Sequence, residues 1–157
     1  MLLPFFQWIE KLPFTEVLRS VDWYGAMINV FHLLALVLFF GGLLIVDLRL
    51  MGKGLTKDPL AQVARAANPW LYGGFLGLLV TGIPQLMLQP IKEYYSDIFW
   101  YKMYILAAAI IFTLTVRRMA TQADEAKLGM WGTLIGLVSI VLWFGVAIPA
   151  RLIGLLS

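Results

Sequence analysis

The feature that most constrains this chain is an uncharged apolar run of 23 residues, from Tyr24 to Val46. At about 1.5 Å of rise per residue, a helix of that length reaches roughly 34 Å, enough to cross a hydrocarbon core of about 30 Å. The run therefore predicts a membrane-spanning helix. It also carries the chain's only histidine, His32. An ionisable ring at that depth costs free energy unless it has a partner, so His32 is the first candidate functional residue.

The composition supports a membrane protein and excludes several kinds of site. Of 157 residues, 61% are hydrophobic and only 13% are charged, more apolar than one soluble core requires. No cysteine is present, which excludes disulfides, thiolate ligands, iron–sulfur clusters and covalently attached haem. The net charge is +3, but the basic residues lie at the ends of apolar stretches instead of forming a patch with aromatic residues. No nucleic-acid partner is therefore expected.

Three more apolar stretches predict further spans. The four spans are expected at about 24–46, 66–88, 98–116 and 129–150. Together they predict one all-α domain over residues 24–157, an integral membrane four-helix bundle in a lipid bilayer. Glycines within the first, second and fourth spans are expected where helix backbones approach closely.

Residues 1–23 predict a separate interfacial segment. Val17, Leu18 and Val21 recur at helical spacing among charged residues, which is typical of a short amphipathic helix lying at the membrane surface. Large aromatic side chains in the same segment suit that level.

The distribution of Lys and Arg predicts the orientation. The first and third loops hold seven of the twelve basic residues, namely Arg49, Lys53, Lys57, Arg65, Arg117, Arg118 and Lys127. Basic loops tend to stay in the cytoplasm. The sequence therefore predicts a multi-pass protein of a bacterial inner membrane, with both termini on the periplasmic side.

Polar residues of the spans fall in one leaflet under this orientation. These candidate cofactor-binding residues are Asn29, His32, Gln85, Lys102 and Arg151. They come from four helices, and no carboxylate is expected inside a span. Such a set suits an anionic or metal-bearing ligand.

A b-type haem matches this set best. An imidazole is a common axial ligand of haem iron, and basic groups suit the propionates. His32 is thus the candidate metal ligand, with the second axial position open or filled by Lys102, Met27, Met103 or a partner subunit. A mostly apolar slot is expected around the macrocycle, lined by aromatic residues such as Trp100, Tyr101, Tyr104, Trp143 and Phe144.

Two stretches carry a resemblance to known proteins. The run HLLALVLFFGGLLIVDLRLMGKGL and the later FWYKMYILAAAIIF resemble an uncharacterised bacterial family of small four-helix membrane proteins with an Asp-Leu-Arg-Leu motif. More distantly, the pattern is similar to CopD-like proteins and HemJ-type protoporphyrinogen oxidases. The distant resemblance implies haem-site roles for His32 and Lys102.

The same residues also have alternative, structural roles. His32 is alternatively a histidine that ties two helices together through Asn29 or Ser139. Lys102 is alternatively a lysine whose side chain extends to the membrane surface. Asp47 and Arg49, at the end of the first span, are expected to be structural, with Arg65 as a partner.

Two functions follow as alternatives. The first is a membrane-embedded haem b protein for electron transfer or porphyrin-related redox chemistry. The second is a non-catalytic accessory subunit of a larger respiratory or photosynthetic membrane complex, with other membrane subunits or further copies of the chain as partners. A transporter is weaker, because no buried carboxylate and no inverted repeat is evident in the spans.

Overall fold

The computed structural model describes residues 2–156, and every regular element in that range is helical. Two short helices, α1 (Leu3–Glu10) and α2 (Pro13–Ser20), precede the long helices α3 (Asp22–Leu50) and α4 (Leu60–Leu88). A short α5 (Pro90–Tyr94) leads into α6 (Asp97–Phe112), which continues through a π-helical turn, η1 (Thr113–Arg117), into α7 (Arg118–Gln122). Helix α8 (Glu125–Leu156) completes the bundle.

Four helical stretches are long and apolar enough to cross a membrane. They are Asp22–Leu50, Leu60–Leu88, Asp97–Gln122 and Lys127–Ile153. The prediction of an all-α, multi-pass membrane protein is therefore confirmed. Each helix extends beyond its predicted apolar run, because polar residues at a span's ends continue the helix beyond the hydrocarbon core.

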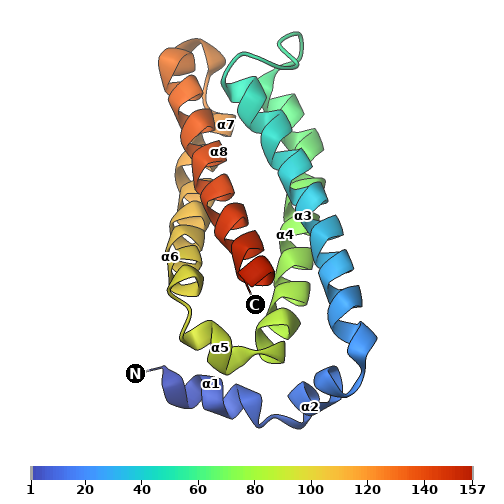
Figure 1. Cartoon of the computed structure of the whole chain (residues 1–157). Helices are drawn as coiled ribbons and strands as arrows, with labels where there is room; N and C mark the ends of the chain where they lie inside the picture. The colour runs from blue at the N-terminus through green and yellow to red at the C-terminus, as the bar shows by residue number, and fades with distance from the viewer. Residues whose placement is uncertain (1, 157) are drawn as a thin grey trace.

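The long helices form two antiparallel pairs, α3 with α4 and α6 with α8 (Figure 1). Helices α1, α2 and α5 lie across one end of the bundle, called here the α5 end; the opposite end, with the loop 51–59 and α7, is the α7 end (Figure 1). Contacts between α3 and α8 join the two pairs.

Close packing inside the bundle depends on glycines, as predicted. A Cβ built on Gly74 of α4 would lie 2.7 Å from the Cα of Phe39 on α3. One built on Gly136 of α8 would lie 2.7 Å from the carbonyl oxygen of Asp47. Real Cβ atoms do not approach so closely, so the backbones meet only because these side chains are absent.

The interior contains two apolar layers along the bundle axis. The middle layer contains Phe39, Leu43, Leu71, Ala109 and Trp143. The second layer, nearer the α7 end, contains Val46, Leu50, Leu60, Val63, Ala64, Ala67 and Ala120.

The N-terminal segment forms two helices where the sequence predicts one. Pro4 is the second residue of α1 and Pro13 is the first residue of α2, since proline suits the first helical turn. The Thr15 hydroxyl donates to the carbonyl of Ile9 across 2.8 Å, and Arg19 donates to the carbonyl of Leu88 across 2.8 Å. The first bond joins α1 to α2, and the second joins the segment to the end of α4. The location of the segment at a membrane surface stays a prediction.

Candidate functional site

His32 is held by the neighbouring helix through one ring nitrogen. Its Nδ1 lies 2.7 Å from the Thr81 hydroxyl oxygen on α4. The Thr81 hydroxyl in turn donates to the carbonyl of Gly77 across 2.6 Å. Because that proton is committed, the Thr81 oxygen accepts from His32, so Nδ1 carries the ring proton and Nε2 keeps its lone pair.

This partner differs from those suggested by the sequence. Neither Asn29 nor Ser139 bonds to His32: Asn29 is exposed, and Ser139 is completely buried beside Asp47. The interhelical tie exists, but Thr81 provides it. The bond from Nδ1 to Thr81 is the only side-chain hydrogen bond that His32 forms with the described residues.

Lys102 lies on α6 at the same level of the bundle as His32. It is half-buried, and its Nζ lies 4.8 Å from the centroid of the Phe99 ring, a cation–π distance. Its charge acts on both His32 and Glu93. Among the described residues, no carboxylate lies within ion-pair distance of Nζ.

Three helices bring these groups to one level of the bundle. His32, Thr81 and Lys102 each stand seven positions, or two helical turns, from a buried residue that faces the interior, in every case toward the α5 end. The respective buried residues are Phe39, Gly74 and Ala109. Residues seven apart share a helix face. The three side chains therefore face the interior of the bundle about 10 Å from its middle layer.

The other predicted site residues lie less centrally. Gln85 is half-buried one turn beyond Thr81 on α4. Asn29 and Arg151 are exposed, and neither forms a side-chain hydrogen bond within the described part of the chain. The structure thus places His32 and Lys102 at one level of the bundle. It does not bring Asn29 or Arg151 into contact with them through a hydrogen bond.

Glu93 on α5 was not singled out by sequence reasoning. Its Oε2 is buried and has no hydrogen-bond partner among the described residues. Burial raises the pKa of the Glu93 carboxyl above its ordinary value, and the positive charges of Lys102 and Lys92 only partly oppose this shift. The Glu93 carboxyl is thus a further polar group near Lys102 at the α5 end.

Aromatic side chains cover this end of the bundle. Phe6 of α1 is buried, and its ring centroid lies 5.3 Å from that of Tyr94 and 6.1 Å from that of Phe99. Trp100 donates from Nε1 to the Tyr94 carbonyl across 2.8 Å. Of the aromatic residues expected near a cofactor, Tyr101 and Tyr104 are about 70% exposed. Trp143 is buried in the middle layer.

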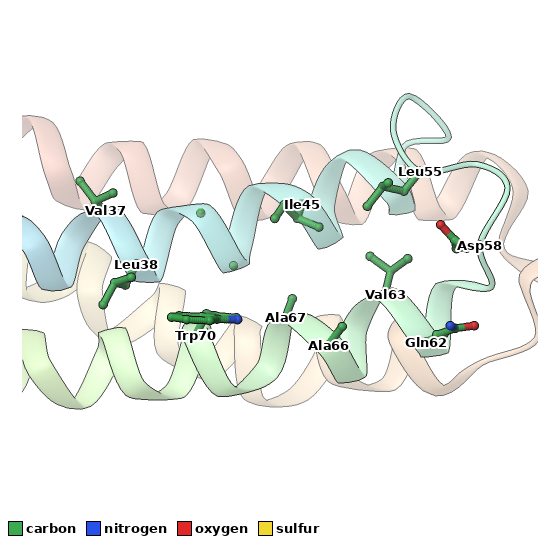
Figure 2. Close-up of a pocket in the computed structure, with 12 residues that line it drawn as sticks. Val37, Leu38, Ile45, Leu55, Asp58, Gln62, Val63, Ala66, Ala67 and Trp70 are labelled. Atoms are coloured by element: carbon green, nitrogen blue, oxygen red, sulfur yellow. The ribbon is translucent and has the colours of Figure 1, made fainter.

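Two grooves lie between α3 and α4. One has a volume of about 560 Å³ and runs from Leu38 and Trp70 to Asp58 and Gln62 at the α7 end (Figure 2). The other, of about 530 Å³, is lined by apolar residues together with Thr81 and Pro84. His32 and Lys102 line neither groove, but the second groove includes Thr81, the hydrogen-bond partner of His32.

A second polar cluster lies between the middle layer and the α7 end. Arg117 donates from Nε to Asp47 Oδ1 across 2.7 Å and from Nη2 to the Leu43 carbonyl across 3.3 Å. Asp47 is 0% exposed and lies inside the first candidate span. The expectation of no carboxylate within a span is therefore wrong, because α3 continues to Leu50.

The partners expected for Asp47 and Arg49 also differ. Asp47 pairs with Arg117, not Arg65, while Arg49 pairs with Glu125 and donates to the Asp58 carbonyl across 2.9 Å. The Glu125 carboxylate also accepts from the backbone N–H of Leu60 across 2.9 Å, at the start of α4. A structural role is consistent with both pairs.

The donor set limits how a metal could be held. Within residues 2–156, no group of three or more His, Cys, Asp or Glu side chains comes together as a metal site. His32 offers a single nitrogen ligand. Such a site suits a metal whose remaining ligands come mainly from a macrocycle.

The apolar spans and the helical pairing define a small multi-pass membrane protein of the all-α class. Residues 5–156 match a family described as "Family of unknown function (DUF6644)", and the chain belongs to that family. No curated protein and no solved structure matches the chain.

Proposed function

We propose that this protein binds a b-type haem near the α5 end of its bundle, with His32 as an axial ligand through Nε2. The observation that carries the proposal is the hydrogen bond from Nδ1 to Thr81. A histidine that binds a metal through one nitrogen usually donates from the other, which fixes its tautomer and ring orientation. Thr81 and Gly77 supply that arrangement without a metal.

Other residues of the chain have supporting roles in this proposal. Lys102 places a positive charge at the same level, suited to a propionate or to the second axial position. Gln85 stands one turn away on α4, while Asn29 and Arg151 are candidates for the rim only. A bound haem would supply one-electron chemistry at its iron, which suits electron transfer or porphyrin-related redox reactions.

Haem content tests the role of His32. The wild-type protein and His32→Ala are produced with ample haem, purified in detergent and assayed for haem per chain. We expect near-stoichiometric haem in the wild type and at least a tenfold loss in His32→Ala. The matched control is Thr133→Val, a change in α8 far from His32, which should retain haem. Equal haem in folded wild type and His32→Ala contradicts the proposal.

A second candidate is an accessory subunit of a larger membrane complex. It is favoured by large apolar side chains exposed on the N-terminal helices, including Phe5, Trp8 and Phe14 at 51%, 58% and 55%. Such side chains suit either lipid or another subunit. Co-purification of a defined partner in mild detergent, lost on Trp8→Ala, supports this role, and a colourless stable monomer argues against it.

We also infer that the α5 end faces the periplasm across a bacterial inner membrane, because most basic loop residues gather at the α7 end. The chain has no cysteine, so single-cysteine variants report orientation without background. An impermeant thiol reagent should label Tyr95→Cys in intact spheroplasts. It should label Thr56→Cys only after lysis, and the reverse pattern contradicts the orientation.

A further inference from the structure

The groove in Figure 2 runs along α3 and α4 at the level of the hydrocarbon core. Its walls include residues between Val37 and Ile45 on α3 and between Val63 and Trp70 on α4, all within candidate spans. At about 1.5 Å of rise per residue, the α3 wall is about 12 Å long, close to one half of a hydrocarbon core of about 30 Å. Val37 and Trp70 are 68% and 60% exposed, so the groove is open to lipid from the side.

The width of the groove suits a hydrocarbon chain better than a helix. Spread along the α3 wall, its volume of about 560 Å³ gives a mean cross-section of roughly 45 Å². A helix with its side chains is about 10–12 Å across and needs roughly 80 Å² or more. Gly41 forms part of the α3 wall, and a Cβ built there has no atom within 4 Å. The glycine therefore leaves space that a larger side chain would fill.

The groove ends among charged side chains at the α7 end. Asp58 and Gln62 line this opening (Figure 2). Lys57 directly precedes Asp58, Lys53 lies in the same loop, and Arg65 stands one turn from Gln62 on α4. The three basic side chains are exposed, and none forms an ion pair with the described residues. Three positive charges against one carboxylate make the opening attractive to an anion.

We propose that this groove binds one anionic phospholipid from the leaflet at the α7 end. One hydrocarbon chain lies between α3 and α4, and the phosphate lies beside the basic side chains of the opening. A wholly apolar molecule would leave those charges without a partner, and a water-soluble anion would not fill the apolar walls. Basic residues next to membrane spans attract anionic lipid headgroups. Hydroxyl groups of a glycerol headgroup can donate to Asp58 and Gln62. The site is independent of the proposed haem.

Native mass spectrometry measures which lipids stay bound to the protein. The wild-type protein, purified in detergent, is titrated with dioleoyl phosphatidylglycerol and separately with dioleoyl phosphatidylcholine, which has the same chains but no net charge. We expect one phosphatidylglycerol per chain, with an affinity roughly tenfold or more above that of phosphatidylcholine. This comparison needs no variant, so it does not depend on whether a variant folds.

Two substitutions locate the lipid. Gly41→Leu fills the groove without a backbone clash, so the affinity for phosphatidylglycerol should fall about tenfold or more. The matched control is Gly73→Leu, because Gly73 also has no atom within 4 Å of a built Cβ but lines the other groove. Lys57→Gln should weaken phosphatidylglycerol binding about fivefold and leave phosphatidylcholine unchanged. Lys11→Gln, at an exposed side chain of the α5 end, should change neither.

Four results overturn the proposal. They are equal affinities of the wild type for the two lipids, unchanged phosphatidylglycerol affinity in Gly41→Leu, an equal loss in Gly73→Leu, and unchanged affinity in Lys57→Gln. A wild-type dimer that Gly41→Leu converts to a monomer, with lipid binding unchanged, would show that a second copy of the chain occupies the groove instead.

Discussion

Asp47 and Arg117 stand 70 positions apart in the chain, and their side chains form a buried ion pair across 2.7 Å. The pair joins α3 to the π-helical turn that ends α6, so it connects the two helical pairs of the bundle. Their relative exposures are 0% and 5%, which leaves little solvent to compensate for a missing partner.

The first prediction concerns this pair. Arg117→Met and Asp47→Leu, made singly, should each destabilise the fold by about 3–5 kcal/mol, because the remaining charge is buried without a partner. The double variant should be much closer to wild type. Unfolding in mixed detergent micelles measures all four proteins, and additive losses in the double variant contradict the account.

The second prediction compares adjacent glycines on α4. Gly74→Ala forces a Cβ against the backbone of Phe39, so it should destabilise the bundle by roughly 1–3 kcal/mol. Gly73 has no atom within 4 Å of a built Cβ, so Gly73→Ala should be neutral or slightly stabilising. Thermal unfolding of the two variants distinguishes them, and equal midpoints would show that the helix contact is absent.

The third prediction tests how His32 is oriented. Thr81→Val keeps the shape of the side chain but removes the acceptor for His32 Nδ1, so haem affinity should fall about 10–100-fold. Thr81→Ser keeps the hydroxyl and should retain affinity. Haem titration followed by absorbance measures both. Equal haem affinities for the Val and Ser variants would show that the Thr81 hydroxyl does not orient His32.

The fourth prediction concerns pH. Because burial raises the pKa of Glu93, the folded chain holds this proton more tightly than the unfolded chain does. The resulting stability is present below the ordinary pKa of 4.5 and is lost as pH rises through the folded-state pKa. Unfolding midpoints of wild type minus those of Glu93→Gln should therefore decline as pH rises from about 4 to about 7.

The control for this measurement is Glu16→Gln, a change at an exposed side chain of α2. Its stability difference from wild type should not depend on pH in the same way. A flat difference for Glu93→Gln would show that the carboxyl is not buried in the folded protein.

The spans were predictable because lipid imposes a simple requirement. Backbone groups in hydrocarbon must bond internally, so a long uncharged run has few alternatives to a helix. Tyr24–Val46 therefore identified the core of α3 correctly. The helix ends could not be read from the same pattern, because Asp47 continues the helix while its charge is neutralised by a distant residue.

The contacts of the candidate site depended on features that the sequence does not display. In the sequence, Arg117 and Arg118 indicate only that this end of the span faces the cytoplasm. In the structure, Arg117 lies in the π-helical turn and bonds to Asp47. Thr81 was not singled out, because its meeting with His32 depends on the rotation of α4 against α3. The convergence of His32 and Lys102 at one level was partly predictable, since the direction of each span fixes its depth.

Haem binding is tested most directly by an absorption spectrum of the purified wild-type protein, first oxidised and then reduced with dithionite. A b-type haem bound at His32 should give a Soret band, with α and β bands that sharpen on reduction. A featureless visible spectrum from folded protein, produced with ample haem, would contradict it.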